Sequence, residues 1–182
     1  MQDLSLNILD IVDNSIKAKA KKIFVTLTVE NNVLSIVIKD DGYGMDKDFL
    51  AKVTDPYSTT RKTRNVGLGI PFFKMEAEMS DGTFDIQSEK GVGTVVTATF
   101  KVDHIDRPPL GDLSETVVAL LPACNECDMV FTFTVEGREF VFDTEELKEQ
   151  LEGVPVDEPY VLQFVRELIQ EKLTRIIGGV IL

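Results

Sequence analysis

A polar stripe along an otherwise apolar helix is the feature that most constrains this chain. Residues 4–17, LSLNILDIVDNSIK, space their apolar side chains as one face of a helix does. The opposite face carries a polar stripe composed of Asp3, Asn7, Asp10, Asn14, Lys17 and Lys21. In it a carboxylate (Asp10) precedes an amide (Asn14) by four residues, and a lysine (Lys17) follows three residues later. Such groups suit a base, a metal ligand and a phosphate contact, whereas a solvated helix face is the simpler alternative.

The rest of the chain alternates strand and helix patterns, which predicts an α/β fold. Period-two alternation between turn residues predicts strands at 22–29, 33–39, 83–88 and 93–101, and a hairpin of 129–135 and 138–143. Helical spacing and end signals predict helices at 47–52, 69–79, 112–121 and 144–151, and a last one from Pro159 to the Gly178-Gly179 pair.

A proline-containing segment divides this pattern into two parts. We expect a domain over residues 1–103, a linker over 104–111, and a small α+β unit of hairpin and helices over 112–182. Three roles are open for the small unit. It would substitute for elements of the fold that are missing before the first helix, form a homodimer, or dock a target protein.

Composition narrows the function classes. The 182 residues carry a net charge of −12, which argues against nucleic-acid binding and against a polybasic membrane anchor. No apolar run reaches the roughly 20 residues that span a bilayer, and no signal-peptide pattern is seen, so a cytoplasmic protein is expected. Cys124 and Cys127 are interpreted as incidental thiols, with a metal or redox role as the alternative.

Two glycine motifs further along suit nucleotide binding. Residues 40–46, DDGYGMD, contain Asp-x-Gly-x-Gly. Its glycines let the backbone approach a flat ring, and its carboxylate can accept a hydrogen bond from an exocyclic amine, although an Asp-Gly turn is the alternative. Residues 66–69, VGLG, open a helix whose free N–H groups suit a phosphate. They end a polar loop over 53–66 that bears Arg61, Lys62 and Arg64.

Together these motifs resemble the GHKL superfamily of gyrase B, heat-shock chaperone ATPases, histidine kinases and MutL. The resemblance covers residues 7–100 and rests on DIVDNS (10–15), DDGYGMD (40–46), PYSTTRK (56–62) and GVGT (91–94). It implies a two-layer α/β sandwich with ATP and Mg²⁺ as its ligands. The stretch PYSTTRK is similar to the entrance of the ATP lid of histidine kinases.

The resemblance assigns roles to three residues of the first helix. Asn14 would hold the magnesium ion, and Lys17 would reach a phosphate. Asp10 occupies the position at which hydrolytic members carry a glutamate general base. Because aspartate is one methylene shorter, a water-organising role for Asp10 stays open, and Asp13 is the rival carboxylate.

The remaining roles concern adenine and the phosphates. Asp41 is identified as the residue that binds the adenine amino group, supported by the hydroxyl of Thr94. The adenine pocket would be shaped by Gly42, Gly44 and Met45. The phosphates would be contacted by Thr60, Arg61, Lys62, Gly67, Leu68 and Gly69.

The expected function is Mg-ATP binding with γ-phosphoryl chemistry. The enzyme would be a stand-alone serine/threonine- or histidine-kinase-like protein kinase, or a slow ATPase switch. The alternative is a non-catalytic module in which ATP gates the binding of a protein partner. No helical-hairpin phosphoacceptor domain is recognised before the core, and His104 lies in the linker, so no phosphoacceptor role is expected for it.

Overall fold

Helix α1 (Leu4–Lys17) forms as predicted and lies across the centre of a mixed sheet. The computed structural model describes residues 3–54 and 69–179. The Asp3 carboxylate caps the helix by accepting a hydrogen bond from the Leu6 N–H at 3.1 Å. The apolar face of α1 is buried in the core through Leu4, Ile8, Ile11 and Val12.

The remaining elements of residues 3–103 follow the predicted order. The strands are β1 (Lys22–Glu30), β2 (Val33–Asp40), β3 (Phe84–Glu89) and β4 (Gly93–Lys101). The helices are α2 (Lys47–Val53) and α3 (Gly69–Met79). A turn at Asn31 and Asn32, both with positive φ, joins β1 to β2 as an antiparallel pair.

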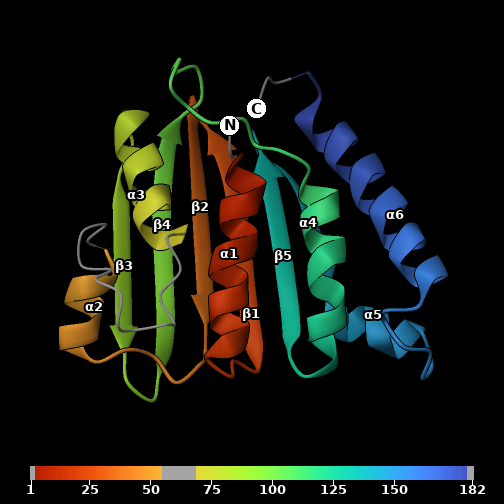
Figure 1. Cartoon of the computed structure of the whole chain (residues 1–182). Coiled ribbons are helices and arrows are strands. Elements are labelled where there is room, and N and C mark those ends of the chain that lie inside the picture. Colours follow the sequence, from red (N-terminus) through yellow and green to blue (C-terminus); the bar gives the residue numbers. More distant parts are fainter. Residues whose placement is uncertain (1–2, 55–68, 180–182) are drawn as a thin grey trace.

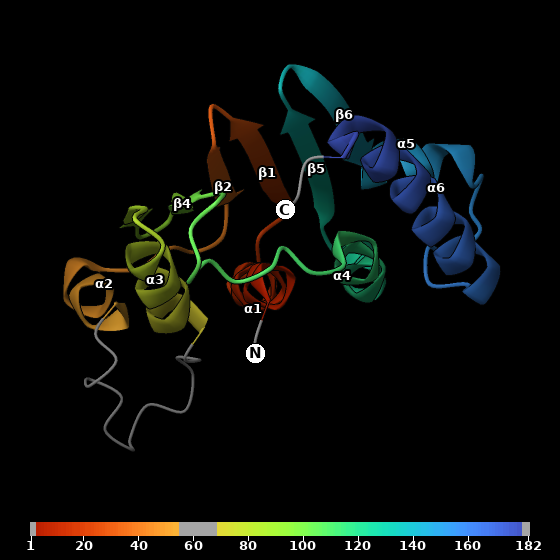
Figure 2. The same cartoon turned by 90° about the horizontal axis from the view of Figure 1, so that it is seen from above.

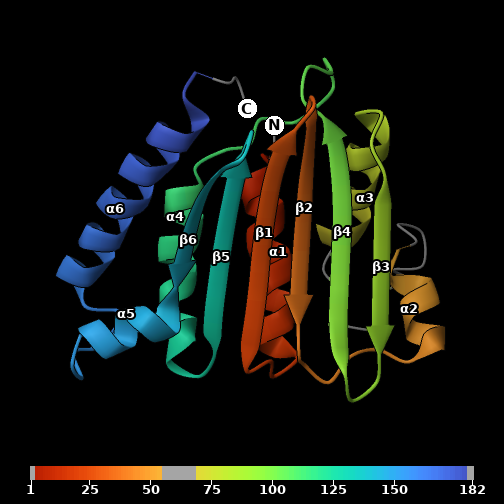
Figure 3. The same cartoon turned by 180° about the vertical axis from the view of Figure 1, so that it is seen from behind.

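Six strands form one sheet in the order β3-β4-β2-β1-β5-β6. Helices α1, α3 and α4 lie on one face of it, as Figure 1 and the view from above in Figure 2 show. Seen from behind, strands β1 to β4 have no described helix in front of them (Figure 3). The protein is therefore a two-layer α/β sandwich, as the sequence predicted.

The C-terminal part extends this same sheet. Its elements are α4 (Leu113–Leu120), the 3₁₀ helix η1 (Leu121–Asn125), β5 (Asp128–Val135), β6 (Arg138–Asp143), α5 (Thr144–Gln150) and α6 (Pro159–Ile177). Strand β5 pairs with β1 in parallel, and β6 pairs with β5 as the predicted hairpin. The hairpin that was expected to belong to a separate small unit is therefore part of the same six-stranded sheet. The domain boundary itself stays a prediction.

The segment predicted as a linker is bound to α1. The N–H groups of Leu4 and Ser5 donate to the carbonyl oxygens of Pro109 and Leu110 at 3.0 and 2.9 Å. The first turn of a helix has N–H groups without helical partners, and this segment satisfies two of them as it crosses from β4 to α4. Residues 104–111 thus help to fix the start of α1.

Replacing Phe133 by alanine tests whether both parts unfold together. Phe133 of β5 is fully buried and lies opposite Leu27 of β1. We expect Phe133→Ala to lower the free energy of unfolding by about 3–5 kcal/mol, because the substitution leaves a cavity in the core. Urea unfolding followed by far-UV circular dichroism should still show one cooperative transition.

Thr132→Ala is the matched control, since Thr132 is the neighbouring residue of β5 and is only half-buried. It should change the free energy of unfolding by about 0.5 kcal/mol or less. Two separate transitions, of which Phe133→Ala shifts only one, would contradict a shared core.

Candidate functional site

A cavity of about 660 Å³ lies between α1 and the ends of β2 and β4. Seven of the residues predicted to form the site line it: Asp10, Asn14, Lys17, Gly44, Met45, Gly69 and Thr94. The helix α1, the loop after β2, the start of β4 and the start of α3 thus converge on one space. The remaining predicted residues require separate description.

The polar stripe of α1 supplies one wall. Asp10 is exposed, Asn14 is half-buried one turn later, and both line the cavity. The Lys17 ammonium lies 2.5 Å from the Asp13 carboxylate. This hydrogen bond raises the pKa of Lys17, so that the lysine is held as a cation at the rim. Asp10 and Asn14 are thus two oxygen-bearing side chains of α1 that line the cavity one helical turn apart.

A second wall, at the end of β2, contains a buried carboxylate, that of Asp40. Its Oδ2 accepts a hydrogen bond from the Ser15 hydroxyl at 2.7 Å, and its Oδ1 accepts one from the Gly42 N–H at 2.9 Å. Only 8% of Asp40 is exposed, and it lines the cavity beside its β4 partner Thr94. An ionised carboxylate has about four acceptor positions, so Asp40 can still receive a donor from a ligand.

Asp41 faces elsewhere, and this corrects its assignment. Its Oδ1 accepts hydrogen bonds from the backbone N–H groups of Lys21 and Lys22 at 2.7 and 2.9 Å. The Lys22 N–H makes the larger contribution to lowering the pKa of the Asp41 carboxyl. Asp41 is exposed and is not among the residues that line the cavity. It holds the start of β1, and Asp40 takes its place as the candidate adenine contact.

The signal for Asp40 is present in the sequence. Counted back from Gly42 and Gly44, the pattern Asp-x-Gly-x-Gly begins at Asp40, and Asp41 is its variable second position. Both residues are aspartate, so residue type alone does not separate them. Strand alternation does, because Ile36, Ile38 and Asp40 face the helix layer together while Asp41 lies one residue beyond β2.

The two glycines of this motif are needed for different reasons. A Cβ on Gly42 would lie 2.8 Å from the Cβ of Ala18, so Gly42 allows the loop to approach the end of α1. Gly44 has a φ of +64°, and a Cβ there would lie 2.0 Å from the carbonyl oxygen of Glu89. Gly42 packs against Ala18 and is not part of the cavity lining, whereas Gly44 is.

Ser88 connects the remaining residues of this wall, and the sequence reasoning missed it. The Ser88 hydroxyl oxygen accepts the Met45 N–H at 2.8 Å and lies 2.8 Å from the Thr94 hydroxyl. It also lies 3.0 Å from the carbonyl oxygen of Gly93. A serine within a short strand carries no motif signal, so only the fold shows that it positions Met45 and Thr94.

The phosphate end of the site is described in part. Gly69 begins α3, and a Cβ on it would lie 3.0 Å from the Cβ of Asp10, so glycine permits α3 to start beside that carboxylate. The predicted lid and phosphate residues Thr60, Arg61, Lys62, Gly67 and Leu68 lie outside the described residues. Their roles stay predictions.

Comparison with known proteins identifies the family. Residues 2–104 match the family of histidine kinase-, DNA gyrase B- and HSP90-like ATPases. The chain belongs to this family. The GHKL match ends before α4, and thus leaves β5, β6 and the last helices outside it. Membership supports ATP binding and phosphoryl chemistry in general terms.

Several relatives of this GHKL domain are sensor kinases. Sensor histidine kinase YvrG of Bacillus subtilis is 31% identical over 98 residues, which are 50% of this chain and 17% of that protein. Heme sensor protein HssS of Staphylococcus saprophyticus is 33% identical over 95 residues, or 50% of this chain and 21% of that protein. The chain thus spans about a fifth of the length of these relatives, 17% and 21%. Within residues 3–54 and 69–179, no helix is long and apolar enough to cross a bilayer.

A buried contact between α1 and α3 of the GHKL domain was not predicted. The Asn7 amide nitrogen donates to the Glu76 carboxylate at 2.5 Å, and Asn7 is 0% exposed. The Asn7 Oδ1 is buried and has no hydrogen-bond partner among the described residues. Burial raises the pKa of Glu76, which outweighs the opposing effect of the Asn7 amide. Asn7 therefore serves the helix junction, although sequence periodicity placed it on the polar stripe.

Glu76→Gln should stabilise the protein at neutral pH. Because the folded-state pKa of Glu76 is raised, its contribution to stability is fully present below the ordinary glutamate pKa of about 4.3 and is lost as pH rises above it. Glutamine stays neutral and offers an N–H donor to the Asn7 oxygen. Differential scanning calorimetry should show a Tm about 2–4 °C above wild type near pH 7, the shift expected for about 1 kcal/mol.

The Tm difference should disappear toward about pH 4, where both side chains are neutral. Glu78→Gln is the control, because Glu78 is exposed and pairs with Lys74 at only 3.9 Å. A Tm difference that is independent of pH, or equal in the two variants, would refute the buried-carboxylate explanation.

Proposed function

We propose that this protein binds Mg-ATP in the described cavity and catalyses γ-phosphoryl chemistry, as a stand-alone protein kinase or a slow ATPase switch. The observation that carries the proposal is the set of side chains that share one cavity lining. It contains a buried, hydrogen-bonded carboxylate (Asp40) and, one helical turn apart on α1, an amide and a carboxylate (Asn14 and Asp10). These groups suit the base and the phosphate end of one nucleotide.

At the base end, Asp40 acts as the adenine selector. Ser15 and Gly42 satisfy part of its hydrogen-bonding capacity and fix its orientation. The remaining lone pairs accept the exocyclic amino group of adenine and reject the carbonyl oxygen that guanine presents at the same position. Thr94 supports this contact from β4, and Met45 supplies an apolar wall.

At the phosphate end, the donor set fits a magnesium ion. Magnesium takes oxygen ligands, keeps several waters and needs few protein groups. The Asn14 amide oxygen is the proposed ligand, because Asn14 lines the cavity one turn after Asp10. Lys17 is the proposed phosphate contact and would exchange its present partner Asp13 for it. Gly69, at the start of α3, is proposed to lie beside the phosphates together with the lid residues Thr60, Arg61, Lys62, Gly67 and Leu68.

Asp10 is the proposed general base. It is exposed to the cavity and abuts the start of α3 at Gly69. From there it can accept a proton from an attacking water or from a substrate hydroxyl. The competing proposal is a non-catalytic gate, in which ATP orders the lid and Asp10 only organises water. Turnover decides between these two functions.

Whether the protein has a phosphoryl acceptor or only a binding partner depends on which of these two functions is correct. A kinase requires a hydroxyl or imidazole acceptor on another protein, since His104 is assigned no such role. His104 is held near Asp81, with Nε2 3.5 Å from the carboxylate. A cytoplasmic location, a homodimer and target docking by residues 112–182 belong to the same proposal.

The adenine assignment is tested by exchanging one carboxylate at a time for an amide. Asp40→Asn should weaken Mg-ATP binding by about 10- to 100-fold, since a charge-assisted hydrogen bond contributes roughly 1.5–3 kcal/mol. Asp41→Asn should leave the affinity within about twofold, because the amide oxygen still accepts the Lys21 and Lys22 N–H groups. Isothermal titration calorimetry measures both affinities, and circular dichroism verifies the fold.

Equal losses in the two variants, or a loss in Asp41→Asn alone, would refute the choice of Asp40. GTP provides a second readout. The preference of wild type for ATP over GTP should shrink in Asp40→Asn and persist in Asp41→Asn.

The catalytic assignment is tested with γ-labelled ATP. Asp10→Asn should keep Mg-ATP affinity within a few-fold and lower phosphate release, or labelling of lysate proteins, by roughly 10²–10⁴-fold. Asp13→Asn is the matched control on the same helix and should retain most of the turnover.

Two results count against the enzyme. Wild type that binds ATP yet shows neither phosphate release nor labelling would favour the gate. Wild-type turnover in Asp10→Asn would assign the chemistry to another group.

A further inference from the structure

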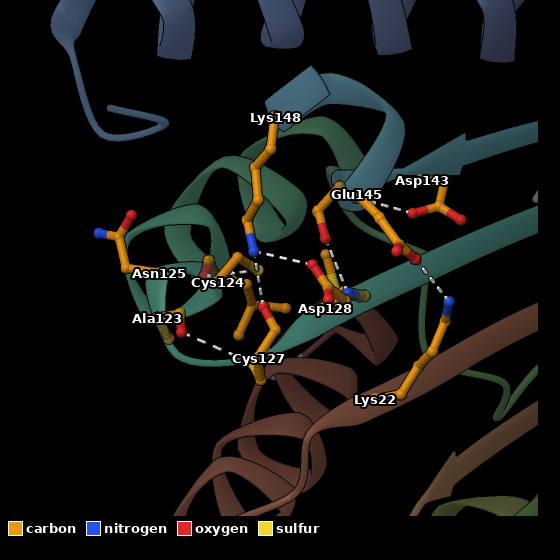
Figure 4. Close-up of polar contacts among 12 residues, drawn as sticks. Lys22, Ala123, Cys124, Asn125, Cys127, Asp128, Asp143, Glu145 and Lys148 are labelled. Carbon is orange, nitrogen blue, oxygen red and sulfur yellow. Dashed lines mark hydrogen bonds and ion pairs between the residues drawn. The ribbon is translucent and has the colours of Figure 1, made fainter. Parts of the chain in front are cut away.

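Cys124 and Cys127 lie together at the end of η1, just before β5 begins at Asp128. They are not among the residues that line the cavity, and the family match ends before them. Figure 4 shows the pair between the turn of η1 and the side chain of Lys148 from α5. The pair thus forms a separate cluster of nucleophilic groups that the proposed ATP chemistry does not use.

The geometry of the turn brings the two thiols together. The Cys124 thiol donates to the Leu120 carbonyl and the Cys127 thiol to the Ala123 carbonyl, each at 3.5 Å. Both bonds span four residues, so the two side chains follow the same side of one helical path. Each thiol has a single proton, and these bonds direct it to a carbonyl. Cysteines three residues apart on one helical turn have Cα atoms within the spacing that a disulfide spans.

The two sulfurs differ in environment. Cys124 is 2% exposed and Cys127 is 5% exposed. The Lys148 ammonium lies 3.3 Å from the Cys127 carbonyl oxygen and 2.7 Å from the Asp128 carboxylate. When Cys127 is a thiolate, the Cys124 thiol can donate to it in place of the Leu120 carbonyl. This hydrogen bond, with a smaller effect of Lys148, lowers the pKa of Cys127 to about 7, although burial, Asp128 and Glu126 oppose this. Hydrogen bonding to Cys127 raises the pKa of Cys124.

The structure supports metal binding by Cys124 and Cys127 less well than it supports their oxidation. Within residues 3–54 and 69–179, no three or more histidine, cysteine, aspartate or glutamate side chains are arranged to hold a metal ion. Structural zinc and iron–sulfur sites need about four ligands, and this cluster offers two thiols. The burial of both sulfurs also disfavours a bulky protein disulfide as reaction partner. A small oxidant is the class that fits.

We propose that Cys124 and Cys127 form a reversible dithiol–disulfide site that is oxidised by a small hydroperoxide. The Cys127 thiolate attacks one peroxide oxygen, the O–O bond breaks, and Cys127 becomes a sulfenic acid while the other oxygen leaves as hydroxide or water. The Cys124 sulfur then attacks the Cys127 sulfur and expels its oxygen, which leaves as water with the proton of the Cys124 thiol. In sum, two thiols and one hydrogen peroxide give one disulfide and two waters. A small dithiol then reduces the disulfide back to two thiols by exchange and is itself oxidised to a cyclic disulfide.

Hydrogen peroxide followed by mass spectrometry tests the proposal on the full chain. Native protein is exposed to peroxide, quenched with catalase, and alkylated under denaturing conditions. The peptide that contains both cysteines should lose two hydrogen atoms, resist alkylation, and recover both thiols after dithiothreitol treatment. The oxidation rate should rise as pH increases through about 7, because the thiolate of Cys127 is the reactive form.

Single substitutions assign the two roles. Cys124→Ser should stop at a sulfenic acid on Cys127, which dimedone traps, whereas Cys127→Ser should leave Cys124 reduced. Lys148→Met should slow the oxidation roughly three- to tenfold, since each unit of rise in thiol pKa removes about nine-tenths of the thiolate. Lys22→Met is the control, because Lys22 pairs with Glu145 at 3.0 Å in the same region (Figure 4).

Three results would overturn the proposal. The first is a wild-type peptide that keeps both thiols after peroxide treatment. The second is a disulfide that links two chains. The third is equal oxidation of the two single-cysteine variants, which would show general thiol reactivity and no division of roles.

Discussion

The burial of β1 between β2 and β5 is the constraint on which the rest of the structure depends. Its inward residues Ile23, Val25, Leu27 and Val29 are almost completely buried under the helices. On one side β1 pairs antiparallel with β2, and on the other it pairs in parallel with β5. Parallel neighbours must be joined by a long connection. Here that connection runs through β2 to β4 and α4, and thus ties both parts of the chain into one core.

This arrangement also sets the candidate site. The pairing of β2 with β4 places Asp40 beside Thr94, and the packing of α1 brings Ser15 to the same carboxylate. A carboxylate in this position is costly unless it is hydrogen-bonded, and Ser15 and Gly42 meet that requirement while leaving acceptor capacity toward the cavity. The same helix places Asn14 and Asp10 in the cavity lining. One helix therefore serves the core, the buried carboxylate and the proposed phosphate end.

The C-terminal part, residues 112–182, lies outside the family match but shares its sheet. The family match ends at residue 104, yet β5 occupies the sheet position next to β1, and α4 lies next to α1 in the helix layer. Residues 112–182 thus continue both the sheet and the helix layer of the family domain. Helix α6 of this part presents the exposed aromatic side chains Tyr160 and Phe164.

The sequence by itself determined the family, the two-layer class, the order of the elements and seven of the residues that line the cavity, because periodicity, glycine motifs and caps are local signals. The prediction named Asp41 in place of Asp40, although strand alternation and the spacing to Gly42 and Gly44 distinguish the two adjacent aspartates. It did not reveal Ser88 or the Asn7–Glu76 contact, because each depends on two elements that are far apart in sequence. The parallel pairing of β1 with β5 was decided by the tertiary structure alone. Strand patterns specify which face is buried, whereas the choice of neighbour depends on how the whole helix layer packs.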